Sequence, residues 1–358
     1  MSASLTVVSS GAYASVQDRG RFGFRRIGVP CSGALDPNLL AIGNALTGNP
    51  ASHPAIECFD GGQQWRAEGG RLLVAVAGNA TLEIADDDGP RSASPWRAYL
   101  LEPGHSLRIV RTGSGRQALL AVAGLEIDAV LGSVSTYARA GLGGWQGRAL
   151  LGGDSLPVVT PANAPIRSLP APFAYEPGPI RVVLGPQDDH FSTRAIRDFL
   201  AQDYTVGTSA DRMGIRLEGA PIDHAEGKGH EIVSDAIVPG AIQVPGNGLP
   251  IILLADAQTA GGYPKIATVI SADLPRVAAS RPGERLRFRA ITPAEGIELA
   301  RLQATRLAQA IASIRQVAGE GVDLKALYCQ NLIGGIVDAM HPDIIPASAK
   351  ADPTTTGP

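Results

Sequence analysis

Short apolar segments, each closed by turn-forming residues, dominate the sequence between residues 71 and 126. Four of them cover residues 72–77, 80–84, 106–110 and 118–122, and Gly, Pro, Asp or Ser residues bound each one. Segments of this length with such boundaries are typical of β-strands. The 43 Gly and 27 Pro among 358 residues supply enough turn residues for many short strands. The pattern therefore predicts a β-barrel or a β-sandwich in this part of the chain.

Chain length and a proline-rich connector predict two domains followed by an extension. A chain of 358 residues is long enough for two domains. Six prolines fall within residues 161–179, a composition typical of a linker, and strands are expected again at residues 180–184, 240–244, 250–255 and 285–289. We therefore predict a mainly β protein with a few helices, with domains at residues 1–170 and 176–292 and an extension over residues 293–358.

Capping residues mark the expected helices. Asp36 can cap a helix that has Pro37 at its first position and ends at Gly48. Ser192 can cap a second helix. In the extension, residues 293–317 predict a long amphipathic helix, residues 324–340 predict another, and the end from residue 348 is expected to be disordered.

Charge and cysteine content exclude several classes of protein. The chain has 31 basic and 34 acidic residues without a long block of either sign, which disfavours a nucleic-acid binder. Three separated cysteines indicate neither a disulfide framework nor a zinc site. The sequence shows no signal peptide and no apolar stretch long enough to span a membrane. We therefore expect a cytoplasmic protein that acts on a small molecule and carries no metal.

Candidate chemical groups gather between residues 239 and 274. The apolar segment 251–254 is followed at once by polar residues and glycines: Asp256, Gln258, Thr259, Gly261, Gly262, Tyr263 and Lys265. Polar groups at the end of a rigid strand are typical of sites, and glycines let a ligand approach the backbone. Lys265 is a candidate acid–base group or carboxylate ligand. The alternative is a turn with a solvated lysine, and composition alone favours that interpretation.

Three further segments carry polar residues. Residues 17–36 form a polar loop ahead of a helix start, where an anion can bind, although Asp36 also serves as an ordinary cap. Residues 137–154 contain Arg148 and several glycines, but their spacing does not match a dinucleotide loop. Arg212 lies in the sequence Asp-Arg-Met-Gly, which alternatively forms a surface ion pair at a turn.

Six motifs in consistent order across residues 5–290 make the chain resemble the biotin-dependent carboxyltransferase family, which includes allophanate hydrolase subunit 2. The motifs cover residues 15–20, 28–30, 32–36, 211–214, 240–245 and 254–265. The resemblance implies two cyclophilin-like β-barrel domains. It also implies site residues: Gln17, Ser32, Asp36, Arg148, Arg212, Gln243, Asp256, Gln258, Tyr263 and Lys265. The chain departs from the family at Cys31, where a small residue is expected, and after Ile291, where the tail is longer.

The activity implied by the resemblance is that of one component of an ATP-dependent 5-oxoprolinase, which opens the lactam of 5-oxo-L-proline to L-glutamate. The implied partners are a B subunit and an A subunit of the LamB/YcsF group. In this interpretation Gln243, Tyr263 and Lys265 stabilise oxyanion charge and Asp256 orients the substrate or accepts a proton.

Two other activities stay open. One is the carboxyltransferase part of a urea or amide carboxylase. None of the three methionines flanks a lysine, so biotin would be carried by another chain. The other is a regulator without activity that binds a B-type partner. Because Gly227-Lys228 is followed by Gly229 and not by Ser or Thr, no Walker loop is present, and we expect ATP to be bound by partner subunits.

Overall fold

The computed structural model describes residues 3–159, 165–317, 335–338 and 341–346. Residues 1–316 form one compact unit, and residues 317–358 form a second unit. In the first unit the described strands make two large sheets, one closed barrel and two sheets of two short strands each. The expectation of a mainly β protein with few helices is confirmed, whereas a second closed barrel is not.

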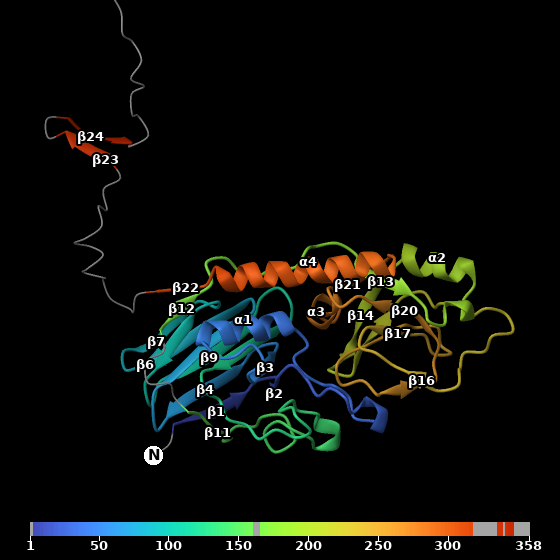
Figure 1. The fold of residues 1–358 in the computed structure, drawn as a ribbon, viewed down its shortest axis with the longest axis horizontal. Coiled ribbons are helices and arrows are strands. Elements are labelled where there is room, and N and C mark those ends of the chain that lie inside the picture. Colours follow the sequence, from blue (N-terminus) through green and yellow to red (C-terminus); the bar gives the residue numbers. More distant parts are fainter. Residues whose placement is uncertain (1–2, 160–164, 318–334, 339–340, 347–358) are drawn as a thin grey trace, which may run out of the picture. The chain divides into compact units, whose positions relative to one another are not determined.

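The first half of the larger unit is built from two antiparallel sheets that face each other (Figure 1). The six-stranded sheet runs in the order β11 (Ser155–Pro157), β1 (Ser4–Ser10), β4 (Gln63–Glu68), β9 (Ser106–Thr112), β6 (Ala80–Asp86) and β7 (Gly89–Ala93). The five-stranded sheet runs in the order β2 (Tyr13–Gln17), β3 (Ala55–Phe59), β10 (Gln117–Val122), β5 (Leu72–Ala77) and β8 (Ala98–Leu101). Of the two arrangements that the strand pattern left open, the sandwich is the one observed.

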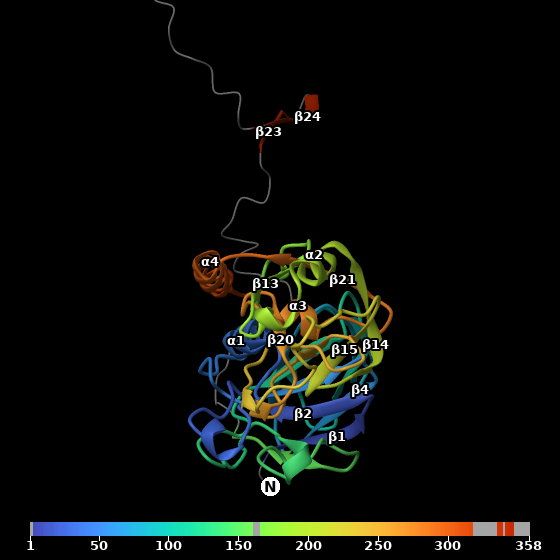
Figure 2. The same cartoon turned by 90° about the vertical axis from the view of Figure 1, so that its right-hand side faces the viewer.

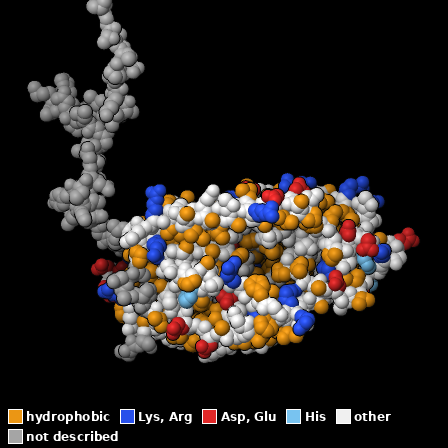
Figure 3. Space-filling model, viewed as in Figure 1, with side chains coloured by type: hydrophobic (Ala, Val, Ile, Leu, Met, Phe, Trp, Pro, Cys, Tyr) orange, Lys and Arg blue, Asp and Glu red, His pale blue; other side chains and the backbone are white. Residues whose placement is uncertain are grey.

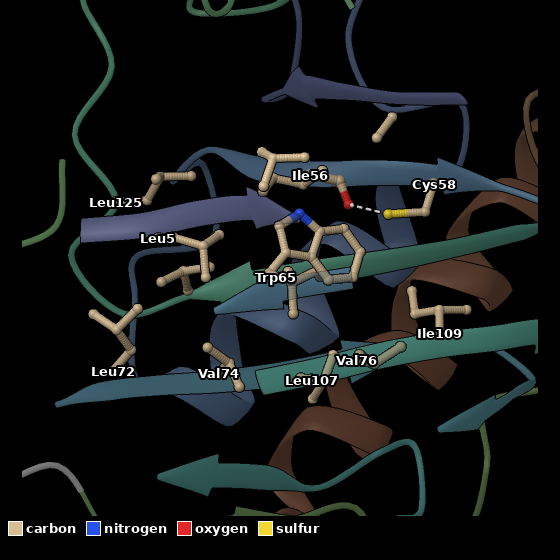
Figure 4. Packing of buried hydrophobic residues seen from close by; sticks show 14 of the residues in the cluster. Leu5, Ile56, Cys58, Trp65, Leu72, Val74, Val76, Leu107, Ile109 and Leu125 are labelled. Atoms are coloured by element: carbon tan, nitrogen blue, oxygen red, sulfur yellow. Dashed lines mark hydrogen bonds between the residues drawn. The ribbon is translucent and has the colours of Figure 1, made fainter. Parts of the chain in front are cut away.

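Trp65 on β4 lies at the centre of the core between these sheets (Figure 4). Its side chain is fully buried, and Leu5, Ile56 and Leu107 from three other strands belong to the same cluster. Alternate residues of β4 are buried and more exposed, as expected for a strand with one face on a core. Trp65 is thus the largest side chain that the two sheets share.

Strands β5 and β10 are buried on both faces, because helices cover the side of their sheet that is turned away from the sandwich core. Every residue of these two strands is buried. Helix α1 (Pro37–Thr47) packs against both of them, and partly buried residues of α4 (Pro293–Ala312) join the same apolar cluster. This burial explains why both strands read as continuous apolar runs in the sequence.

The second half closes into a seven-stranded barrel. Around the barrel the order is β13 (Ile180–Leu184), β20 (Lys265–Val269), β17 (Ala241–Gln243), β18 (Ile251–Leu253), β15 (Gly214–Glu218), β14 (Asp203–Ala210) and β21 (Arg285–Ala290), and β21 pairs in parallel with β13. Its core contains the ring cluster Phe199, Tyr204 and Phe288. Leu35 and Phe59 from the first half pack against this core, so the sandwich and the barrel share an apolar boundary.

Two helix starts and one helix end agree with the predicted caps. The Asp36 carboxylate accepts hydrogen bonds from the backbone N–H groups of Asn38 and Leu39, and Gly48 ends α1 in the left-handed conformation. Ser192 caps α2 (Thr193–Ala201). A short helix, α3 (Leu274–Ala278), precedes β21.

Helix α4 begins at the predicted Pro293 with a capping box between Thr292 and Glu295, and it ends at Ala312, five residues before the predicted end. It contacts both α1 and β13 and so lies along both halves of the unit (Figures 1 and 2). Beyond it, β22 (Arg315–Gln316) pairs with β12 (Arg167–Ser168). No helix within the described residues is long and apolar enough to cross a membrane.

In the second unit the described residues form a hairpin of β23 (Gly335–Asp338) and β24 (His341–Pro346). The helix predicted over residues 324–340 is therefore wrong at residues 335–338. Ile336 and Val337 are β-branched, which favours an extended backbone. The rest of that helix and the end from residue 348 lie outside the described residues, and the division into domains at residues 161–179 stays a prediction.

We expect Trp65→Ala to lower the free energy of unfolding by about 3–5 kcal/mol, because it leaves a large cavity between two sheets. Trp65→Phe should cost less. The indole N–H is buried without a hydrogen-bond partner among the described residues, so its removal leaves no acceptor unpaired. Urea denaturation measures both changes. Val110→Ala, on an exposed position of β9, is the control and should change stability by less than about 0.5 kcal/mol. A loss below about 1 kcal/mol for Trp65→Ala would contradict the role given to this residue.

Candidate functional site

A cavity of about 270 Å³ opens where the sandwich meets the barrel. Tyr13 and Phe59 line it from the five-stranded sheet, and Met213 and Asp256 line it from the barrel. Three arginines also line it: Arg116, Arg139 and Arg212. Sites at the boundary of two structural halves are common because each half can supply groups independently. This cavity is therefore the candidate site.

Arg212 is the buried cation beneath the cavity, and it contacts both halves. Its Nε lies 2.9 Å from Oδ2 of Asp256, and its Nη2 lies 3.2 Å from Oδ1, so the contact is two-pronged. Its Nη1 donates to the carboxylate of Glu57 on β3, and Nη2 also donates to the carbonyl of Gly33 at 2.6 Å. One guanidinium thus connects the sandwich, the loop before α1 and the barrel.

Local backbone pairing positions these groups. Arg212 lies two residues before β15, which pairs with β18. Asp256 follows β18, and its N–H donates to the carbonyl of Arg212 at 3.0 Å. Glu57 lies in the middle of β3, where it also accepts a hydrogen bond from the N–H of Leu35 at 2.7 Å. Glu57 therefore lies within a strand, while a backbone hydrogen bond joins Arg212 and Asp256 just beyond two paired strands.

Burial and charge shape the protonation of the cluster. Burial alone would lower the pKa of Arg212, but Glu57 and Asp256 raise it, so the guanidinium stays charged. Burial raises the pKa of Glu57, with the nearby Asp256 adding to that rise and Arg212 opposing it. Two carboxylates face one cation, so the cluster can accept a further positive charge or an N–H donor.

Tyr13 supplies a neutral hydroxyl to the cavity wall. Burial raises the pKa of Tyr13; Ser15 and Arg212 oppose this rise, and the carboxylates of Glu57 and Asp256 add to it by less. The phenol is therefore protonated at neutral pH and can donate a hydrogen bond. Its ring stacks edge-on against Phe59 with centroids 5.7 Å apart, which orients it.

The predicted loop 17–36 reaches the cavity region through Ser32 and Gly33. Ser32 has φ of 51°, an unusual conformation for a residue with a side chain, and its N–H donates to the carbonyl of Ala255 at 3.1 Å. Its hydroxyl is buried without a hydrogen-bond partner among the described residues. A Cβ on Gly33 would lie 2.9 Å from the backbone of Gly20, so this position requires glycine. The turn thus holds Ser32 against Ala255, the residue that precedes Asp256.

The predicted residues of the 239–274 segment divide between two places. Asp256 follows β18, whereas Gln243 pairs with Ile251 at the start of β18 and with Lys265. The two groups therefore lie toward opposite ends of this strand. Lys265 is 2% exposed, and its Nζ lies 2.8 Å from Oδ2 of Asp235. It is a buried lysine with a fixed partner and not the solvated lysine of the alternative interpretation.

The loop between these ends holds the other predicted residues. Gln243 Nε2 lies 3.5 Å from the carbonyl of Tyr263, and the Tyr263 side chain is 39% exposed. A Cβ on Gly261 would lie 2.8 Å from Nε2 of Gln243 and 3.5 Å from Nε2 of Gln258. Thr259 accepts a backbone hydrogen bond from Ile237, and Gly262 accepts one from Ile232. These residues gather around the Lys265 end of β18.

The remaining predicted residues have structural partners. Gln17 is buried and donates to Ser15 and to the carbonyl of Thr136. Asp36 caps α1, and the single hydroxyl of Tyr175 in the linker donates to its carboxylate, lying 2.7 Å from each of the two oxygens. Arg148 pairs with Asp154 at 2.7 Å outside the cavity. The structure does not bring these three residues to the cavity wall.

Sequence analysis did not select Glu57, Tyr13, Arg116 or, within the segment 137–154 that it did note, Arg139. Glu57 did carry a signal, because it is the one charged residue in the fully buried strand Ala55–Phe59. A buried carboxylate within an apolar strand requires a partner. The other three lie near the ends of strands or turns that are distant in sequence, and only the fold brings them together.

We expect Arg212→Met to lower the free energy of unfolding by about 3–5 kcal/mol, because Glu57 and Asp256 would then be buried without their cation. Adding Glu57→Gln and Asp256→Asn should restore part of this loss, and urea denaturation measures both. Arg66→Met, which breaks the surface pair with Glu68, is the matched control and should cost less than about 1 kcal/mol. Stability of Arg212→Met within about 1 kcal/mol of the unchanged protein would show that the buried cluster is not needed for folding.

The contact between Lys265 and Asp235 makes the stability of the fold depend on pH. The hydrogen bond from Lys265, followed by bonds from the N–H of Ala236 and from Gln187, lowers the pKa of Asp235 to about 2. The pair therefore stabilises the fold above the unfolded pKa of about 3.9, and that contribution is lost as the pH falls through about 2. In Lys265→Met, NMR titration of the Asp235 carboxyl carbon should give a midpoint shifted up toward about 3.9. Asp189, whose pKa Lys228 lowers, is the control and should not change. An unshifted Asp235 midpoint would refute the pairing.

Comparisons with known proteins agree with the resemblance seen in the sequence. The family model described as "Carboxyltransferase domain, subdomain A and B" matches residues 27–290. The C subunit of 5-oxoprolinase from Haemophilus influenzae is 38% identical over 314 residues, which are 86% of this chain and 96% of that protein. The C subunit of 5-oxoprolinase from Escherichia coli is 34% identical over 287 residues, which are 79% of this chain and 90% of that protein.

A solved structure is similar in fold as well. The crystal structure of Kluyveromyces lactis urea carboxylase matches with a TM-score of 0.78 and 26% identity, over 88% of this chain and 30% of that one. The chain therefore corresponds to less than a third of that larger protein. Because the family model covers well over half of the sequence, the chain belongs to the carboxyltransferase domain family, subdomains A and B.

Proposed function

We propose that this chain is the C subunit of an ATP-dependent 5-oxoprolinase that opens 5-oxo-L-proline to L-glutamate. The observation that carries the proposal is the extent of the match. The chain covers 96% and 90% of two 5-oxoprolinase C subunits but only 30% of the urea carboxylase. The identity to these C subunits, 34% and 38%, is also higher than the 26% identity to the urea carboxylase, which supports the first role.

The cavity supports this proposal through the groups that it presents to a lactam. Opening a lactam breaks the ring C–N bond after water attacks the carbonyl carbon. The water oxygen enters the new carboxylate, and both protons of the water end on the nitrogen, which becomes an ammonium group. Asp256, fixed by Arg212, can accept a hydrogen bond from the ring N–H. The protonated hydroxyl of Tyr13 can donate to the carbonyl oxygen. Both groups line the same cavity.

We propose that ATP is bound by the partner subunits, because the one Gly-Lys pair that could start a phosphate-binding loop does not continue as such a loop. Lys228 follows Gly227 but precedes Gly229, and its Nζ is paired with Asp189 at 2.6 Å. The described part of the chain also holds no group of three or more His, Cys, Asp or Glu residues that could bind a metal ion. We therefore assign ATP to the partner subunits, for which we propose a B-subunit-like protein and a LamB/YcsF-family A subunit.

A second candidate function is a carboxyltransferase that acts on urea or a similar amide. The fold similarity to the urea carboxylase favours it. In that role the same cavity would meet carboxybiotin carried by another chain, because no lysine of this sequence lies beside a methionine. A purely regulatory chain that binds a B-type partner is the third possibility.

Glutamate release from 5-oxoproline and ATP tests the proposal, using this chain assembled with its A and B partners. We expect activity that requires all three chains. Asp256→Asn should lower kcat/KM by about 100-fold or more, because it removes the proposed acceptor while keeping the size of the side chain.

Lys265→Ala, compared in the same assay, tells which end of β18 serves the reaction. A large loss with Asp256→Asn alone places the chemistry in the cavity beside Arg212. A large loss with Lys265→Ala alone places it near Asp235 and Tyr263. An assembled complex without any glutamate release would reject the 5-oxoprolinase role and favour the carboxyltransferase or the regulator.

A further inference from the structure

We propose that Arg139 binds the carboxylate of the substrate, and that the cavity between the sandwich and the barrel therefore selects small cyclic amides that carry a carboxylate. This inference rests on the proposed function and extends it, because it names the residue that binds the carboxylate of the substrate. Urea has no carboxylate, so such a residue would serve a 5-oxoprolinase and not a urea carboxylase.

Arg139 has unused donors at the cavity wall. It lies in the short 3-10 turn Ala138–Ala140 and lines the cavity. Its ion pair among the described residues is with Asp211, and the Nη2 to Oδ2 distance of 4.0 Å is too long for a hydrogen bond. Its side chain is 64% exposed. A guanidinium presents a planar pair of donors that matches a carboxylate.

The other two arginines of the cavity are already engaged. Arg116 donates to Asp60 at 2.7 Å and to the carbonyl of Ala210 at 3.3 Å, and its guanidinium lies 5.3 Å from the centre of the Phe59 ring. Arg212 is held by Asp256 and Glu57. Arg139 is therefore the arginine of this cavity with the weakest internal partner.

The remaining groups of the cavity complete the recognition of a lactam acid. Asp256 offers an acceptor for a ring N–H, and Tyr13 offers a donor for a carbonyl oxygen. Phe59 and Met213 supply apolar surface for ring carbons. A cavity of about 270 Å³ suits a ligand of metabolite size. Anionic, neutral polar and apolar parts of such a molecule each meet a matching group.

Asp211 competes with the proposed ligand. Its carboxylate lies beside Arg139, while its Oδ1 accepts hydrogen bonds from the N–H groups of Met213 and Gly214. Replacing it with asparagine keeps an oxygen for that turn and removes the competing charge. Changes at Arg139 and at Asp211 should therefore act in opposite directions.

The test uses the three-subunit complex and measures kcat and KM for 5-oxoproline in four variants and one control variant. KM should rise in the order of the unchanged protein, Arg139→Lys, Arg139→Ala and Arg139→Glu, with about a tenfold rise for Arg139→Ala. Because the side chain acts on binding and not on the reacting bond, kcat should change by less than about threefold. Asp211→Asn should lower KM. Arg66→Ala, another exposed arginine outside the cavity, is the control and should leave both constants unchanged.

The outcomes separate this inference from the proposed function. If the unchanged complex releases no glutamate, the proposed function itself fails. If it is active but KM in Arg139→Ala and Arg139→Glu stays within about twofold, the inference fails and the function stands. A fall in kcat without the graded rise in KM would also reject carboxylate binding and would assign Arg139 a structural role. Thermal unfolding of each variant shows whether it folds, and the mostly exposed side chain makes folding the expected result.

Discussion

The contact of Arg212 with Glu57, Asp256 and the carbonyl of Gly33 is the interaction on which the candidate site depends. A guanidinium has five N–H donors in one plane, so it can join three segments that come from distant parts of the sequence. Lysine has the same charge but no such plane, and it cannot hold Asp256 by two parallel bonds. Once Arg212 is fixed, the position of Asp256 at the cavity follows, and so does the approach of the loop before α1.

Polar contacts of this kind need an apolar frame, which the rest of the larger unit supplies. Leu35 and Phe59 of the first half belong to the apolar cluster of the barrel. This apolar packing keeps water away from the buried charges. Helix α4 lies along both halves, and a Cβ on its Gly296 would lie only 3.2 Å from Ile270. Asp36 joins in a different way, since one carboxylate caps α1 and holds Tyr175 of the linker. Several independent contacts therefore fix one orientation of the two halves, and the distances within the cavity depend on it.

Much of this could be predicted from the sequence where the cause is local. The caps at Asp36 and Ser192 depend on neighbouring residues, and both were predicted correctly. The buried strands were visible as apolar runs, although a sandwich and a closed barrel have the same local pattern. The separation of Lys265 from Asp256 could not be predicted. The segment between them can form a tight turn that brings the two side chains together or a longer loop that keeps them apart, and the local sequence favours neither. Only the pairing of Gln243 with both Ile251 and Lys265 decides between these paths. The hairpin at residues 335–346 shows the same limit, since a helix pattern was expected where β-branched residues pair.

The buried cluster also explains why a chain with ordinary surface charge can hold a specific site. Acidic and basic side chains are interspersed on the face seen in Figure 3, so no large field of one sign directs a ligand to it. Within the cavity the balance is different, because two carboxylates share one buried guanidinium while Arg139 has only a long contact. On our proposal, Asp256 would accept a hydrogen bond from the N–H of the amide, and Arg139 would bind the carboxylate of an amide that carries one. Burying an ion cluster costs desolvation energy that apolar residues would not. The position that the cluster gives Asp256 therefore explains the cluster better than a gain in stability does.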